Sequence, residues 1–183
     1  MSKSAKKTKK NFVLQIVYIA LLIAINVILT RFLSIQTQFL RIDFGFLPVA
    51  FAGIAFGPFW GAVAGAAGDI LGMIIYPTDT YFPGFTLTAL LTGVIFGLLY
   101  RKKITFVRVL IVSAVVCLVL NLCLDTLWLD IMYGNGFFVI LPARVIKCII
   151  NIPIYTFLVK IIWDKAFSRL SAVSAGISYV NDN

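Results

Sequence analysis

Apolar residues along this chain gather in long stretches, separated by short polar or Gly/Pro-containing segments. A helix that crosses a bilayer needs about 20 mostly apolar residues. Six stretches reach or approach this length, and the second is short and marked by Gly and Pro. They run from Asn11 to Leu33, Phe44 to Gly57, Phe59 to Tyr76, Phe85 to Tyr100, Ile104 to Leu129 and Phe137 to Trp163. The pattern predicts an all-α membrane protein with six transmembrane helices.

Positive charges lie mainly at the ends of these stretches. If all six helices span, twelve of the sixteen Lys and Arg residues fall on one side of the membrane. Because Lys and Arg are enriched in cytoplasmic loops, we expect both termini in the cytoplasm. The chain then divides into a basic tail at 1–10, a six-helix transmembrane domain at 11–163 and a second tail at 164–183. The twelve residues are Lys3, Lys6, Lys7, Lys9, Lys10, Arg101, Lys102, Lys103, Arg108, Lys160, Lys165 and Arg169.

Composition indicates that lipid is the solvent for much of the chain. Hydrophobic residues make up 61% of its 183 residues, charged residues 13%, and the mean hydropathy is +1.02. The net charge of +9 would suggest nucleic acid if the cations formed a patch on a soluble fold, but here they flank apolar stretches. We predict a multi-pass protein of the cell membrane. We read Phe12 to Leu29 as a retained first helix, because it is long enough to span and no small-residue cleavage site follows it.

The residue inventory argues against catalysis and metal binding. The chain has no His, all seven of its acidic residues are Asp, and it lacks a Walker-type phosphate loop. Its cysteines lie in apolar stretches without CxxC spacing, so we expect buried free thiols. We predict a protein that is not an enzyme and has no cofactor and no metal site. The three cysteines are Cys117, Cys123 and Cys148.

Four charged residues lie well inside the predicted spans. A charge at the centre of a bilayer costs roughly 2.5–3.5 kcal/mol on insertion scales, so each of them needs a partner, water or a function. Three of them, Asp125, Arg144 and Lys147, belong to two polar stripes at helical spacing. The stripes are Asn121, Asp125 and Trp128 on the fifth helix and Arg144, Lys147 and Asn151 on the sixth. The predicted topology puts both stripes, together with Asp69 of the third helix, in the outer half of the membrane. A pocket open to the outside is the favoured interpretation, and charge pairs that join the helices are the alternative.

Two further patterns are open to more than one interpretation. The outer loop from Pro77 to Gly84 carries two prolines and a glycine, which give a shaped turn that either faces a ligand or only connects two helices. Small residues recur four apart, a spacing that lets helices approach closely in lipid. Internal packing is the expected role of most of them. The pairs and runs are Ala20/Ala24, Gly53/Gly57/Gly61/Gly65, Gly68/Gly72 and Gly93/Gly97.

Three strings in the chain resemble the folate-specific S components of energy-coupling factor (ECF) vitamin transporters. They are Arg41 to Pro48, Gly61 to Gly72 and Tyr81 to Ala89, within a resemblance that covers Asn11 to Lys160. The resemblance implies six helices, both termini inside, a prokaryotic cell membrane and a vitamin-binding subunit. It also implies docking on a transmembrane coupling subunit driven by two ATPase subunits. The family's helix-one docking motif would correspond to Ala20 and Ala24 here.

The polar and aromatic residues suit the chemistry of folate. Asp125 or Asp69 would accept two N–H bonds from the pterin edge in a charge-assisted bidentate arrangement. The expected roles of the other residues are as follows: Asn121 and Asn151 complete the hydrogen-bond pattern, Trp128, Phe44, Tyr81 and Phe82 stack on the rings, and Arg41, Arg144 and Lys147 hold the carboxylates.

Three alternatives remain beside a folate-binding subunit. The first is a subunit for another vitamin such as riboflavin, which competition binding with riboflavin, biotin and thiamine would distinguish. Riboflavin would not require the cations, and thiamine, itself a cation, would favour a site with more acids. A small membrane enzyme acting on lipid headgroups would need turnover, which the absence of His and Glu disfavours. A scaffold with internally paired charges would bind no small molecule.

Overall fold

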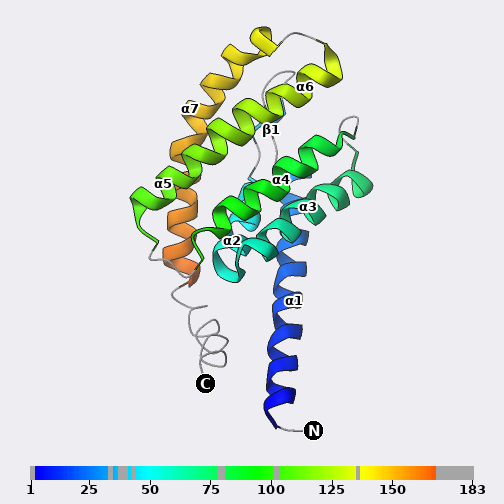
Figure 1. The fold of residues 1–183 in the computed structure, drawn as a ribbon, viewed down its shortest axis with the longest axis vertical. Coiled ribbons are helices and arrows are strands. Elements are labelled where there is room, and N and C mark those ends of the chain that lie inside the picture. The colour runs from blue at the N-terminus through cyan, green and yellow to red at the C-terminus, as the bar shows by residue number, and fades with distance from the viewer. Residues whose placement is uncertain are drawn as a thin grey trace.

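The computed structural model describes residues 3–32, 35–36, 41–42, 44–77, 81–100, 104–134 and 137–167. These residues form helices and one antiparallel two-stranded hairpin (Figure 1). The hairpin pairs β1 (Ile35–Gln36) with β2 (Arg41–Ile42). The helices are α1 (Lys3–Arg31), α2 (Phe46–Phe56), α3 (Pro58–Ile75), α4 (Pro83–Gly97), α5 (Phe106–Val115), the π-helix η1 (Val116–Leu124), α6 (Asp125–Tyr133), α7 (Phe137–Ile162) and the π-helix η2 (Trp163–Phe167).

Six apolar helices result, because α5, η1 and α6 follow one another without a break. Four helices are long and apolar enough to cross a membrane: Phe12–Arg31, Pro58–Ile75, Phe106–Tyr133 and Arg144–Lys165. Two shorter apolar helices, Phe46–Phe56 and Pro83–Gly97, complete the set. The prediction of six helices with a short second one is confirmed. The first helix begins at Lys3, earlier than its first apolar residues, so the basic stretch before Asn11 is helical.

The two ends of the bundle differ in the elements that they carry. In Figure 1 α1 begins at the bottom, α5 begins at about mid-height on the left, and α6 and the start of α7 lie at the upper end. Lys160 near the end of α7 donates hydrogen bonds to the Ile104 carbonyl, at 3.1 Å, and to Asp164, at 2.8 Å. The charge pattern predicted that the chain before α5 and the end of α7 lie on one side of the membrane, and the bond from Lys160 to Ile104 agrees with this. The tail at 168–183 and the basic residues at 101–103 lie outside the described residues.

Glycines let α2, α3 and α4 pack backbone against backbone. A Cβ atom on Gly93 of α4 would collide with the carbonyl of Gly61 on α3, and one on Gly53 of α2 would lie 2.6 Å from the Gly93 carbonyl oxygen. A Cβ on Gly97 would collide with Pro58 at the start of α3. In lipid, such close approach supplies dispersion contacts that the hydrophobic effect does not provide. The prediction of internal packing is confirmed for these glycines.

The largest buried cluster joins α2 and α4 to the α5–α7 half of the bundle. Phe46 of α2 stacks on Tyr155 of α7 with ring centroids 3.5 Å apart, and Phe96 of α4 is fully buried in the same cluster. Cys117 and Cys148 are buried, as expected, but Cys123 is exposed and corrects the prediction for that thiol. The reason is that a residue in an apolar stretch of a membrane protein can face lipid as well as the core.

Candidate substrate-binding site

Asp69 of α3 is engaged with residues of α1 and α4 rather than with the two polar stripes. Its Oδ1 lies 3.9 Å from Nη2 of Arg31, whose side chain is 3% exposed. Its Oδ2 accepts a 2.7 Å hydrogen bond from Thr86, and the Thr86 hydroxyl lies 3.3 Å from that of Tyr81. Asp69 is therefore the centre of a network that joins three helices. That Asp69 lies at the same depth as the two polar stripes stays a prediction.

Two polar side chains of α1 lie over glycines of α3. Asn26 donates a 2.7 Å hydrogen bond to the Gly45 carbonyl before α2. A Cβ on Gly68 would collide with the Asn26 side chain, and a Cβ on Gly72 would lie 2.7 Å from Nε of Arg31. Glycine at 68 and 72 thus provides the space in which both polar groups can be buried. The spacing of this glycine pair serves helix packing, as expected.

An aromatic cluster forms where α4 begins beside α6. The rings of Phe82 and Trp128 have centroids 5.6 Å apart, and Phe82 and Phe85 meet edge to face at 6.2 Å. The indole N–H of Trp128 donates to the Thr88 hydroxyl at 3.2 Å. Gly84 is required here, since a Cβ would lie 2.5 Å from both the Phe82 and the Trp128 ring atoms. Two predicted stacking residues from distant parts of the chain are therefore in contact.

Arg144 of α7 is held against the π-helix η1. Its Nη1 donates a 2.9 Å hydrogen bond to the backbone carbonyl of Asn121. The residue is 9% exposed, and its Nε is buried without a hydrogen-bond partner among the described residues. One turn along α7, the Cys148 thiol donates to the Cys117 carbonyl at 3.1 Å. The guanidinium is thus fixed at one nitrogen and keeps donor capacity for another group.

Asp125 brings a negative charge into the same region. It is the first residue of α6 and lies within electrostatic range of Arg144. Lys147, one turn along α7 from Arg144, lies within the same range of Cys117 and Cys148. An acid and two cations of the polar stripes are therefore found in one region of the bundle, next to η1.

The fifth helix departs from the α-helical spacing assumed for its stripe. The buried positions from Val109 to Leu120 (109, 113, 116, 117 and 120) lie on one face at helical spacing, but the next buried residue, Thr126, comes six positions later. Bonds from i to i+5 in η1 rotate the residues that follow relative to an uninterrupted α-helix. Asp125 and Trp128 both lie on α6 and keep their spacing of three. Asn121 lies in η1, where a rotation of 100° per residue does not apply, so its direction relative to Asp125 does not follow from the predicted stripe.

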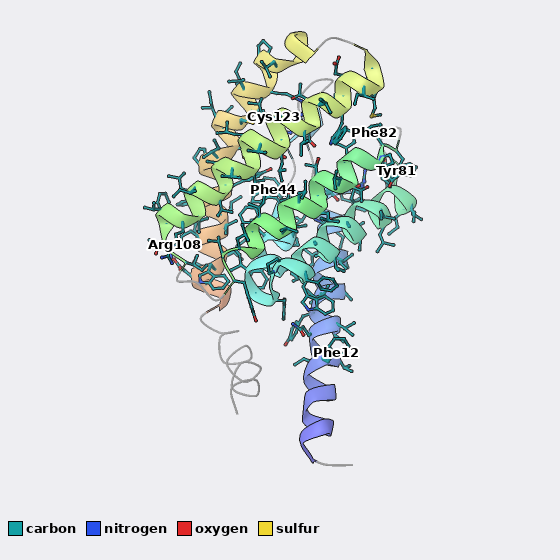
Figure 2. All side chains as sticks on the ribbon, in the orientation of Figure 1. Phe12, Phe44, Tyr81, Phe82, Arg108 and Cys123 are labelled. Atoms are coloured by element: carbon teal, nitrogen blue, oxygen red, sulfur yellow. The ribbon has the colours of Figure 1, made fainter. Side chains whose placement is uncertain are left out.

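The other predicted site residues have less specific surroundings. Phe44 is half-buried against the large core cluster, and Asn151 is buried on α7, two turns from Arg144. Tyr81 is exposed next to α4, and Figure 2 places it beside Phe82, well above Phe12 on α1. The backbone of Arg41 lies in β2, and its side chain falls outside the described residues.

Several residues of this region were missed from the sequence. Arg31 lies within the predicted first span, close to its end, and was not among the charged residues singled out. Thr86 and Thr88 gave little signal, because threonines in membrane helices commonly bond to their own backbone. Asn26 had a clearer signal, as an amide in the middle of an apolar helix.

An apolar hollow elsewhere in the molecule does not fit the predicted ligand. It is lined by Leu47, Ala50, Phe51, Ile54, Val159, Ile162 and Trp163, between α2 and the end of α7. Its cavity volume of about 10 Å³ is far below the roughly 300–1,000 Å³ usual for small-molecule sites, and its lining has no charged group. Within the described residues, no group of His, Cys, Asp and Glu could hold a metal ion.

The fold and the intramembrane polar residues define a small multi-pass membrane protein of the substrate-binding kind. Residues 14–163 match the family described as "ECF transporter, substrate-specific component". The chain belongs to this family, whose members are binding subunits of bacterial membrane transporters and not enzymes.

Individual relatives agree with this assignment. The chain is 41% identical to the folate transporter FolT of Clostridium novyi (strain NT) over 159 residues, covering 86% of this chain and 92% of the relative. It is 33% identical to FolT of Leuconostoc mesenteroides subsp. mesenteroides over 147 residues, covering 76% and 79% of the two chains. It also resembles a crystal structure of FolT bound with folic acid, with a TM-score of 0.78 and 38% identity over 82% of this chain and 92% of that one.

Proposed function

We propose that this protein binds folate from the outer side of the membrane and delivers it across as the S component of an ECF transporter. The observation that carries the proposal is the likeness to FolT with folic acid bound, which spans most of both chains at 38% identity. The predicted site residues are consistent with it, because they include flat aromatic groups, acids and cations. A transmembrane coupling subunit and two ATPase subunits would supply the energy, since this chain has no phosphate-binding loop of its own.

Asp125 and Arg144 are the proposed contacts of the pterin edge, which moves Arg144 from its predicted place at the carboxylates. The aminopyrimidinone ring offers adjacent N–H donors and a 4-oxo acceptor. A carboxylate would take the donors, and a neighbouring guanidinium would donate to the acceptor. The interaction between the charges of Asp125 and Arg144 supports one shared binding end for both residues. Asp69 is a weaker candidate, because Arg31 and Thr86 already occupy its two oxygens.

The remaining predicted contacts are assigned around this pair. Trp128 and Phe82 would stack on the rings, with Phe44 and Tyr81 extending the aromatic lining. Asn121 and Asn151 would supply amide hydrogen bonds. A dianionic glutamate tail is costly to bury, so it would lie nearer the outer surface, where Arg41 of the hairpin could pair with it. Lys147 is the second cation proposed for the carboxylates.

The test is titration of folate into the purified, detergent-solubilised protein, followed by tryptophan fluorescence. The chain has three tryptophans, so a Trp60→Phe/Trp163→Phe variant that keeps Trp128 reports on the proposed site alone. We expect saturable quenching at one folate per chain, which riboflavin and thiamine do not reproduce. Quenching that disappears in this variant but remains in Trp128→Phe would place the ligand elsewhere.

Ala20 and Ala24 of α1 are the proposed docking surface for the coupling subunit. Both are exposed, whereas Ile19 and Val27 on the same helix are buried. Alanines on an exposed helix face permit close approach of another helix in lipid. Small side chains at positions 20 and 24 are compatible with two roles, a contact with a helix of the coupling subunit and simple exposure to lipid. Uptake measured with the assembled complex distinguishes the two, as described in the Discussion.

A further inference from the structure

The π-helix η1 lies in the middle of the fifth transmembrane helix and faces α7. It covers nine residues, Val116–Leu124. Most π-helical segments in proteins are single-turn bulges, and they are frequent at functional sites. Because i→i+5 bonding changes the rotation of everything that follows, η1 determines where Asp125 and Trp128 point relative to α5. The substrate site proposed above thus depends on the register of this segment.

Two side chains of α7 bind two carbonyls of η1 in a matched pattern. Arg144 donates to the carbonyl of Asn121 at 2.9 Å, and Cys148 donates to that of Cys117 at 3.1 Å. The donors are four residues apart on α7, and the acceptors are four residues apart on η1 in the opposite order. The two bonds therefore act one turn apart along the same antiparallel pair of helices.

The two donors differ in the number of N–H or S–H groups that remain for other partners. Cys148 is 3% exposed, inside the helix–helix contact, and its thiol has one polar hydrogen, which this bond uses. Arg144 has five N–H donors, so one bond to Asn121 leaves others for a ligand. Cys148 is thus suited to hold η1 and α7 in register, and Arg144 is suited to bind a ligand from the position that this register gives it.

We propose that Cys148 is a positioning residue for substrate binding. Its thiol fixes η1 against α7, so that the Asn121 carbonyl holds Arg144 beside Asp125, where the guanidinium meets the 4-oxo group of the pterin. This inference rests on the proposed function. It adds that a buried thiol, which does not contact the substrate, contributes to the choice between 4-oxo and 4-amino pteridines.

The experiment compares Cys148→Ala with Cys148→Ser, which differ by one hydroxyl donor. Affinity is measured for folate and for its 2,4-diamino analogue, in which a 4-amino donor replaces the 4-oxo acceptor. We expect Cys148→Ala to bind folate about fivefold more weakly, the effect of one net hydrogen bond, with the affinity for the analogue unchanged. Cys148→Ser should restore folate affinity. Cys123→Ala, an exposed cysteine of the same π-helix, is the control and should match wild type.

A second comparison tests whether Cys148 acts through Arg144. In an Arg144→Ala background, Cys148→Ala should have no further effect on folate affinity, because the group that it positions is gone. An equal loss for both ligands, a Ser variant as weak as the Ala variant, or the same fivefold loss in both backgrounds would overturn the inference.

The outcomes separate the inference from the proposed function. If wild type binds folate and Cys148→Ala binds it equally well, the positioning role is wrong and the folate-binding function stands. If wild type binds no folate, the proposed function fails and the positioning role fails with it. Thermal unfolding of each variant, measured in parallel, shows whether a change in affinity accompanies a change in stability.

Discussion

The Arg31–Asp69 pair allows a prediction that tests whether Asp69 stabilises the fold or binds the ligand. Asp69→Asn keeps the shape of the side chain and an oxygen that can accept from Thr86, but it removes the negative charge beside Arg31. The Arg31 side chain is 3% exposed, so its charge would remain buried. We expect the variant to lose stability while its folate affinity stays close to that of wild type.

The magnitude follows from the separation of the charges. At 3.9 Å the Coulomb attraction is about 1 kcal/mol in water and about 4 kcal/mol at an effective dielectric constant of 20. Asp69 is 24% exposed, which screens the pair partly and favours a value between these limits. We therefore expect a loss of about 2–3 kcal/mol, which corresponds to a fall in Tm of roughly 5–10 °C for a chain of this size.

The assay is thermal unfolding in detergent, with folate titration below the transition. Arg31→Gln/Asp69→Asn removes both charges and should recover part of the lost stability, since breaking one half of a buried pair is worse than removing the whole. An Asp69→Asn variant with unchanged Tm and a folate affinity reduced by a factor of 100 or so, as expected for a lost charged hydrogen bond, would refute the reasoning. Asp69 would then be the acid that meets the pterin.

Three further predictions concern the site, the docking surface and the packing. Arg144→Ala should weaken folate binding by about 100-fold, the loss of charged hydrogen bonds, with unchanged helical content by circular dichroism; normal affinity would remove Arg144 from the site. Ala20→Leu should leave folate binding by the isolated subunit unchanged and abolish uptake by the assembled complex in vesicles, whereas Ile25→Phe, about 140° around α1, should permit uptake. Persisting uptake in Ala20→Leu would place the docking surface elsewhere. Gly93→Ala should lower stability by about 1–3 kcal/mol, because its Cβ meets the Gly61 backbone, and an unfolding temperature equal to that of wild type would contradict the packing described here.

Much of the fold could be predicted because the bilayer imposes strict requirements on sequence. Spanning helices must be long and apolar, so six stretches, including the short second one, were visible without any structure. The charge at helix ends gave the common side of the termini through the same solvent physics. Glycine spacing indicated close packing, and the contact between Gly61 and Gly93 confirms it. None of these inferences required knowledge of which helices are neighbours.

The site was only partly predictable, because partners across helices cannot be read from one helix at a time. The structure pairs Asp69 with Arg31, thirty-eight positions earlier in the chain, and the pattern of the third helix alone does not show this contact. Arg31 was not among the charged residues that the sequence analysis singled out. The structure turns it into a buried cation, because Gly72 on α3 leaves space for it.

The sequence by itself determined the class of protein, since composition, span lengths and charge placement are set by the solvent around each segment. Tertiary structure decided which polar groups meet. Helical spacing assumes 100° per residue, and the π-helix η1 breaks that rule where Asn121 precedes Asp125. η1 packs against α7, where the Cys148 thiol donates to the Cys117 carbonyl. A local pattern cannot contain that contact, because its two residues lie thirty-one positions apart in the chain.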